Sequence, residues 1–168
     1  PLIFILLWSS AFITTKPIVD NSNPFAALAF RFFFVAVGFY LFSLYSKNSI
    51  IIKKNNLVES VLSGVLFHGL YLGGVFYSIS IGMPTSIAAL IVTLQPILTN
   101  ALSGPILNEK VTIKQWIGVL LGFFGAALVL GLDIGIDIPL LGLIATIIAL
   151  ISITTSTIWQ KKLSNNLP

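Results

Sequence analysis

Long apolar stretches separated by short polar turns fill almost the whole chain, and their length limits what it can fold into. A helix needs roughly 20 mostly apolar residues to cross a hydrocarbon core about 30 Å thick. Six stretches approach this length, and they cover about residues 2–19, 24–45, 57–80, 84–106, 112–131 and 139–159. Because 57% of the residues are hydrophobic and only 8% are charged, the sequence predicts an all-α, polytopic transmembrane helical bundle with six spans.

Polar residues mark the starts of three of these helices. Asn23 stands where an N-cap is expected, immediately before the proline that opens the second helix. Asn56 with Glu59, and Thr112 with Gln115, have the spacing of capping pairs at the starts of the third and fifth helices. These positions predict where the three helices begin.

Lysines gather at one end of the predicted bundle, in or beside the connections that follow the second, fourth and sixth spans. They are Lys47, Lys53, Lys54, Lys110, Lys114, Lys161 and Lys162. The opposite connections carry Asp20, Asp133 and Asp137, with Lys16 as their only basic neighbour. Because cytoplasmic loops accumulate Lys and Arg, this pattern predicts a cytoplasmic N-terminus. The same bias accounts for the net charge of +4, so we expect no nucleic-acid partner.

Amide side chains at membrane depth are costly to bury and are therefore candidates for a binding site. Gln95 lies near the middle of the fourth span beside Pro96, which cannot donate to the carbonyl of Val92. Asn100 follows one turn beyond Pro96. We expect Gln95 and Asn100 to line a substrate cavity. The alternative is that they only hold helices together through interhelical hydrogen bonds.

His68 and Tyr71 lie near the centre of the third span, on one face of the helix. Gly64, one turn before His68, would leave room for a ligand or for a neighbouring helix. We expect His68 and Tyr71 to line the substrate pathway, with His68 as a candidate proton sensor. A histidine that donates to a backbone carbonyl in a packed core is the alternative.

Two further candidates lie in the first and second spans. Arg31 is about two turns into the second span, among four phenylalanines, and could bind a substrate anion. A structural role, with the guanidinium reaching toward the membrane surface, is the alternative for Arg31. Ser10, close to Trp8 in the first span, is expected to line the same cavity.

Catalytic and cofactor patterns are missing from the sequence. It has no HExxH, no Gly-x-Ser-x-Gly, no P-loop and no dinucleotide-binding glycine pattern. A single histidine and the absence of cysteine exclude a multi-histidine or thiolate metal site. We therefore expect no enzyme, no cofactor and no metal.

Several motifs resemble the EamA-type carriers of the drug/metabolite transporter superfamily. In chain order, the similar segments are residues 8–16, 27–32, 86–90, 95–96, 107–110 and 115–118, with Gly125. Asn108 departs from the pattern, because the family usually has Gly before Glu109. Asn is the next most tolerant residue of a left-handed turn, so this departure changes little.

The resemblance implies ten helices in two inverted halves of five. Residues 1–131 would form the first EamA-like repeat, and residues 139–168 would hold the first helix of a second, truncated repeat. Residues 140–163 are similar to a weak copy of the first span. Because the chain opens at Pro1 without Met, we expect a fragment whose first span is incomplete.

The resemblance further implies a secondary-active transporter, a permease or exporter that moves a small metabolite by alternating access. We expect it in the bacterial cytoplasmic (plasma) membrane, with a central cavity lined by the first, third, fourth and sixth helices. The expected partners are a small-molecule substrate and the lipid bilayer. A homodimer is a further possible assembly.

The alternative function is a non-transporting membrane subunit or scaffold that packs against a partner through glycine faces. The glycines concerned are Gly69 and Gly73 in the third span and Gly118, Gly122 and Gly125 in the fifth. Neither function names a substrate, a direction of transport or a coupling ion.

Overall fold

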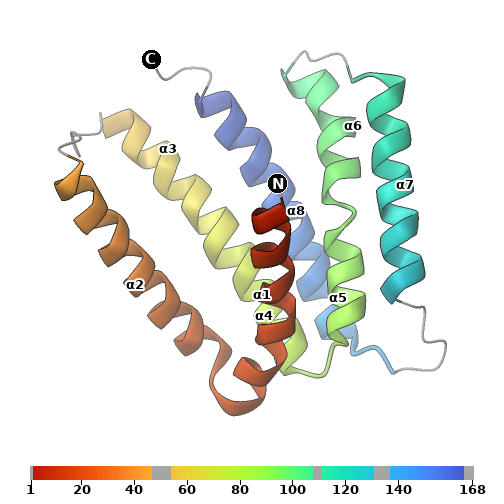
Figure 1. Ribbon diagram of the computed structural model, residues 1–168, viewed down its shortest axis with the longest axis horizontal. Helices are drawn as coiled ribbons and strands as arrows, with labels where there is room; N and C mark the ends of the chain where they lie inside the picture. Colours follow the sequence, from red (N-terminus) through yellow and green to blue (C-terminus); the bar gives the residue numbers. More distant parts are fainter. Residues whose placement is uncertain (1, 47–53, 108–110, 131–136, 165–168) are drawn as a thin grey trace.

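The computed structural model describes residues 2–46, 54–107, 111–130 and 137–164, and most of these lie in helices (Figure 1). The elements are α1 (Leu2–Asn21), α2 (Pro24–Tyr45), α3 (Lys54–Gly64), η1 (Val65–Leu72), α4 (Gly73–Ser80), α5 (Thr85–Val92), α6 (Gln95–Leu107), α7 (Ile113–Leu130) and α8 (Leu140–Ser164). The elements α3, η1 and α4 run on as one rod, and only two residues separate α5 from α6. The described part of the chain therefore forms six rods that match the six predicted spans.

Four of these rods are long and apolar enough to cross a membrane. Within the described ranges they are Pro24–Tyr45, Leu57–Ser80, Thr85–Leu107 and Leu140–Leu163, and Ile113–Leu128 forms a shorter apolar helix. The predicted fold class, an all-α polytopic transmembrane bundle, is confirmed.

Successive rods run in opposite directions, so their ends gather at two faces of the bundle (Figure 1). The start of α3, the start of α7 and the end of α8 lie at the same face (Figure 1). Lys54, Lys114, Lys161 and Lys162 belong to these ends. The remaining clustered lysines lie outside the described residues, as does Asp133. A cytoplasmic position for the lysine-rich face stays a prediction.

Two of the predicted caps are confirmed by their hydrogen bonds. The Asn23 Oδ1 atom accepts from the backbone N–H groups of Phe25, at 3.0 Å, and Ala26, at 3.2 Å. At α7, the Thr112 N–H donates to Gln115 Oε1 at 2.8 Å, while the Gln115 N–H donates to Thr112 Oγ1 at 3.4 Å. Both arrangements satisfy backbone donors that the first turn of a helix leaves unpaired.

The predicted cap at Asn56 is wrong. The helix α3 begins at Lys54, so Asn56 lies inside its first turn instead of preceding it. The apolar pattern indicates where a span enters hydrocarbon, whereas a helix can continue for a polar turn into the watery interface.

A tight turn joins α4 to α5 at Gly82, whose φ of 98° is in the left-handed region that glycine adopts without strain. The Gly82 N–H donates to the Ile79 carbonyl at 3.1 Å, and the Met83 N–H donates to the Ser78 carbonyl at 3.0 Å. These two bonds form a Schellman motif, which satisfies the last carbonyls of α4. The turn brings α5 back alongside α4 within four residues.

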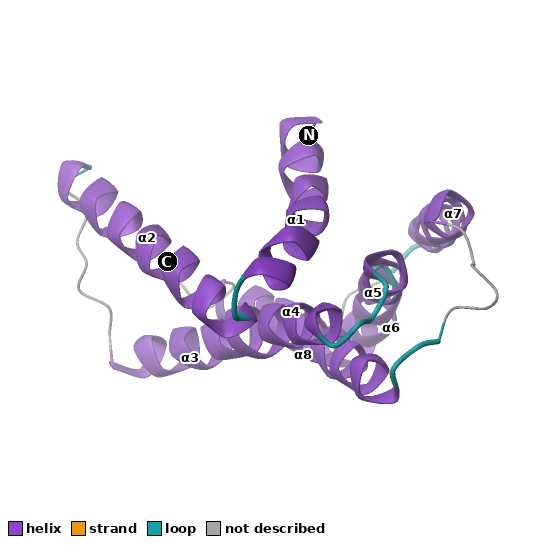
Figure 2. Ribbon diagram, turned by 90° about the horizontal axis from the view of Figure 1, so that it is seen from below, coloured by secondary structure: helices purple, strands orange, loops and turns teal. Residues whose placement is uncertain are grey.

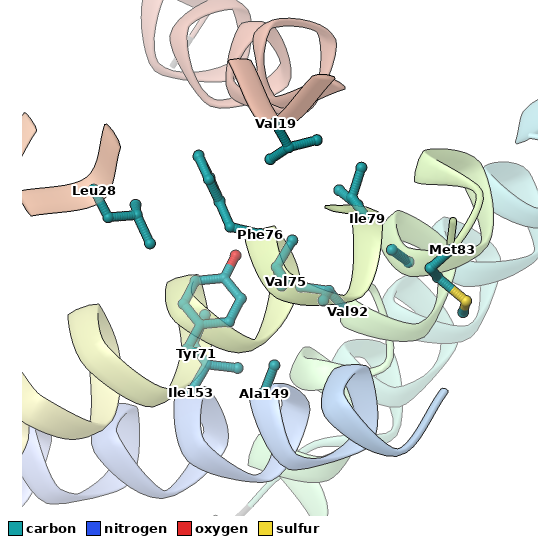
Figure 3. Close-up of a cluster of buried hydrophobic side chains, with 11 residues drawn as sticks. Val19, Leu28, Tyr71, Val75, Phe76, Ile79, Met83, Val92, Ala149 and Ile153 are labelled. Atoms are coloured by element: carbon teal, nitrogen blue, oxygen red, sulfur yellow. The ribbon is translucent and has the colours of Figure 1, made fainter. Parts of the chain in front are cut away.

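The core lies where α4 and η1 face α8, with the ends of α1 and α2 packed over them. Val19 of α1 and Leu28 of α2 point toward Phe76 of α4, while Ala149 and Ile153 of α8 approach from the opposite side (Figure 3). Seen from below, α8 lies alongside α3 and α4, whereas α1 and α2 rise away from this layer (Figure 2). Half of an 18-residue stretch of α8 is buried, against 6% in α2. The sixth rod is therefore the central one.

A glycine allows the closest approach between α4 and α8, but it is not one of those predicted. A Cβ atom added at Gly74 would lie 2.9 Å from the Ala145 carbonyl oxygen and 3.1 Å from the Ala149 Cβ. At Gly73 the nearest neighbour of such an atom, helix backbone and chain neighbours aside, would be a Phe25 ring carbon at 3.7 Å, and at Gly69 it would be Val65 at 3.8 Å. The glycine that contacts α8 is therefore Gly74, the residue after Gly73 of the predicted pair.

The glycines of α7 also differ from expectation. Gly118, Gly122 and Gly125 have no atom of the described residues within 4 Å of an added Cβ, helix backbone and chain neighbours aside. Within the described part of the chain, no neighbouring helix packs closely on this face of α7.

Candidate functional site

A cavity of ≈ 1000 Å³ opens between α1, α2 and the rod made of α3, η1 and α4. Its volume is at the upper end of the range for small-molecule sites. Three of the predicted site residues line it, namely Arg31 of α2 and His68 and Tyr71 of η1. Thr15 and Ala11 contribute the wall from α1. The structure therefore brings half of the predicted set to one space.

The segment that carries His68 and Tyr71 is a π-helix, which is wider than an α-helix and occurs frequently at functional sites. The His68 ring lies 4.9 Å from the Phe32 ring and 5.0 Å from the Phe67 ring, measured between centroids. His68 is exposed toward the cavity, so it does not sit in a closed core. Two flanking aromatic rings restrict its orientation at the cavity wall.

Tyr71 is only 2% exposed and belongs both to the core and to the cavity wall. Its ring packs edge-on against Phe67, with 5.6 Å between centroids. In Figure 3 its hydroxyl points from η1 toward Phe76. Tyr71 can thus present a polar atom to a ligand from a position that packing holds fixed.

Arg31 is exposed on α2 and faces the same cavity. His68 and Tyr71 line this cavity with it. The ion pair present among the described residues joins Lys16 to Asp20 within α1, at 3.1 Å, and does not involve Arg31. Arg31 therefore brings a positive charge without a carboxylate partner from the described residues.

Gln95 lies at a break in the fourth rod. α5 ends at Val92, and α6 begins at Gln95 after a two-residue turn. The Gln95 Nε2 atom donates to Thr157 Oγ1 of α8 at 3.1 Å. Pro96 has no N–H for the Val92 carbonyl, which accounts for a break at this place. Gln95 links the break to the central helix.

Asn100 faces a second and smaller cavity of ≈ 120 Å³ between α6, α7 and α8. Thr99, Ser103, Thr157 and Lys161 also line this space. The Thr99 hydroxyl oxygen is buried and has no hydrogen-bond partner among the described residues. Polar residues of α6 therefore lie beside α8.

The polar contacts of α8 extend to the third rod. The Ser156 Oγ atom lies 3.1 Å from Ser63 Oγ and donates to the Ser63 carbonyl at 3.0 Å. Gln160 Nε2 donates to Ser156 Oγ at 3.3 Å. Sequence reasoning missed Ser63, Ser156 and Thr157 as interhelical partners. The available signal was the polar run at residues 152–157 in an otherwise apolar helix.

The predicted site residues do not share one central cavity. The larger cavity is lined by the first, second and third rods, and the smaller by the fourth, fifth and sixth. The helix α8 packs against both η1 and α6, and its described residues line only the smaller space. Ser10 lies on α1 and lines neither cavity. That these residues bind a substrate stays a prediction.

The apolar rods, the break in the fourth helix and the cavity between α2 and η1 define an integral membrane protein with room for a small molecule. The EamA-like transporter family matches residues 2–131, which is more than half of the chain. The chain belongs to this family. The resemblance seen in its motifs is confirmed, and the names of the family and of its relatives describe transporters, not enzymes.

Relatives come from bacteria. The "Uncharacterized transporter YvbV" of Bacillus subtilis (strain 168) is 30% identical over 63% of this chain and 33% of its own length. The "Uncharacterized transporter YoaV" of the same strain is 23% identical over 93% of this chain and 54% of its own length. The "Probable amino-acid metabolite efflux pump" of Escherichia coli (strain K12) is 25% identical over 98% of this chain and 53% of its own length.

The chain thus spans between a third and just over half of the length of these relatives. No solved structure matches it significantly.

Proposed function

We propose that the protein is a secondary-active transporter, a permease or exporter, which moves a small metabolite across the bacterial cytoplasmic membrane. The observation that carries this proposal is the ≈ 1000 Å³ cavity at the level of Arg31, His68 and Tyr71, in a chain of a transporter family. Ionisable residues inside a membrane segment are costly and mark substrate pathways by default. The E. coli relative, named as a probable metabolite efflux pump, supports a small-molecule cargo.

Alternating access is the mechanism we propose. Carriers built from inverted repeats bind substrate near the bilayer midplane, between helices that are broken there. The break between Val92 and Gln95, tied to α8 through Thr157, is a feature of this kind. In this proposal residues 1–131 form one repeat, residues 139–168 begin the second, and the N-terminus is cytoplasmic.

The direct test is flux through the full-length protein in proteoliposomes. His68→Leu removes a polar group from the cavity wall at similar volume, and Gln95→Leu removes the contact at the break. Leu121→Ala, on the exposed side of α7, is the control. We expect flux to fall at least about tenfold for His68→Leu and Gln95→Leu, and to stay near wild type for the control. Unchanged flux in both test variants would overturn the site, and no flux for any solute would overturn the function.

One observation favours the alternative function of a scaffold or homodimer. The exposed glycines of α7 form a face that another helix could approach closely. Gly118→Leu with Gly122→Leu would block such an approach. If the protein is a scaffold, these changes should dissociate a complex that wild type forms in membranes; if it is a monomeric carrier, its mass in native membranes should not change.

A further inference from the structure

The walls of the larger cavity are apolar and rich in aromatic rings. Its polar groups are few, and aromatic rings from α2, η1 and α4 surround them. The rings belong to Phe25, Phe32, Phe39, Phe67, Tyr71 and Phe76. Aromatic walls stabilise a ligand with a large apolar body, above all one with a ring that can stack or pack edge-on. A small, fully hydrated solute would gain little from these walls.

The charge on the walls has one sign. Among the described residues that line the cavity, Arg31 carries a permanent charge and none is Asp or Glu. A guanidinium in a low-dielectric site attracts an anion strongly, and its planar fork matches the two oxygens of a carboxylate. Arg31 would repel an ammonium group, and only cation–π contacts with the aromatic rings would offset this repulsion. The electrostatics of the cavity therefore discriminate by charge sign.

Polar groups that could bind one end of a ligand also line this cavity. Arg31, His68 and Tyr71 line the same cavity, and the two aromatic rings beside His68 hold it at the wall. An imidazole N–H and a phenolic O–H can each donate a hydrogen bond to a carboxylate oxygen. These groups supply polar donors to a cavity whose walls are otherwise mostly apolar.

We propose that this cavity selects organic carboxylates with a large apolar, ring-bearing body, with the carboxylate bound at Arg31 and the body held by the surrounding phenylalanines. The transport of such a compound rests on the function proposed above, whereas its binding does not. The substrate class is therefore set by one cation and the rings around it.

Binding to the full-length protein in lipid nanodiscs tests this directly. The probes are 3-phenylpropionate, its neutral amide and 3-phenylpropylamine, which share one apolar body and differ in charge. We expect the carboxylate to bind at least about tenfold more tightly than the amide, and the amine to bind most weakly. Equal binding of all three, or tightest binding of the amine, would overturn the proposal.

Two substitutions at Arg31 test whether the preference for the carboxylate depends on this residue. Arg31→Gln should weaken carboxylate binding at least about tenfold and leave the amide nearly unchanged, while Arg31→Lys should keep part of the preference. Lys16→Gln, which removes an exposed positive charge outside the cavity, is the matched control. Equal loss for Lys16→Gln and Arg31→Gln would mean a general surface-charge effect and would overturn the assignment.

The same preparation separates this proposal from the transport function. Selective carboxylate binding without flux in proteoliposomes would leave the binding site standing and refute transport. Flux of other solutes without carboxylate binding would refute the site and leave transport standing.

Discussion

Gln95 of α6 donates a hydrogen bond to the hydroxyl of Thr157 of α8, 3.1 Å away, although the two residues are 62 positions apart in the chain. The Thr157 hydroxyl donates its own hydrogen bond to the Ile153 carbonyl at 2.7 Å, so its oxygen can accept from Gln95. The interruption between α5 and α6 is thereby fixed to the central helix. A polar contact of this kind sets which face of α6 meets α8.

The strength of this contact can be measured with a double-mutant cycle. Gln95→Leu and Thr157→Val each remove one partner, and together they remove the pair. We expect a coupling energy of about 0.6 kcal/mol, the average for interhelical hydrogen bonds in membranes. The measurement is the free energy of unfolding of wild type, the two single variants and the double variant. Each protein is held in a mild detergent and unfolded by adding a denaturing detergent. Strictly additive losses would show that the bond contributes nothing to stability.

Gly74→Ala should destabilise the bundle. The added Cβ would lie 2.9 Å from the Ala145 carbonyl oxygen, which is backbone and cannot move aside cheaply. We expect a loss of about 1–3 kcal/mol, the usual cost of overpacking. Gly122→Ala is the control, because nothing lies within 4 Å of its added Cβ, and it should be neutral or slightly stabilising. A thermal unfolding midpoint that is the same for Gly74→Ala and wild type would contradict the close packing of α4 on α8.

Gly82→Ala should also destabilise, for a different reason. The site has open space for a side chain, but its φ of 98° is unfavourable for any residue with a Cβ. We expect a cost of about 1–3 kcal/mol, with Gly82→Asn less affected, because Asn tolerates left-handed backbone better. If Gly82→Ala and Gly82→Asn unfold at the same temperature as wild type, the turn does not require this conformation.

The predicted orientation can be tested by labelling single introduced cysteines, because this chain has no cysteine of its own that would also react. Ser22→Cys lies in the exposed turn between α1 and α2, and Lys162→Cys lies at the exposed end of α8. In intact cells, a membrane-impermeant maleimide should label Ser22→Cys and should label Lys162→Cys only after permeabilisation. The opposite pattern would place the N-terminus outside.

The spans and most of their caps were predictable because they depend on neighbours in the sequence. Asn23 and Thr112 cap helices through bonds to residues two or three positions away, and apolar length alone predicts a membrane span. The π-helical turn at His68 was not predictable, since no local pattern distinguishes it from an ordinary helical turn.

Which helices meet was the harder question. In a lipid-facing helix every side is apolar, so the hydrophobic pattern that reveals the buried face of a soluble helix is lost. Gly73 and Gly74 are adjacent in the sequence, yet only Gly74 faces α8, about 100° around the helix. For the same reason Arg31 and His68 could each be recognised as costly in a membrane, whereas their shared cavity could not.

The central position of α8 has a consequence for biogenesis. α8 is the last of the six rods along the chain, and it supplies Ala149 and Ile153 to the core and the partners of Ser63 and Gln95. If the helices are inserted one after another during synthesis, the first five lie in the bilayer without their main packing partner until α8 is inserted. The first five rods would thus be loosely associated until α8 has been inserted, and their contacts with α8 would form only then.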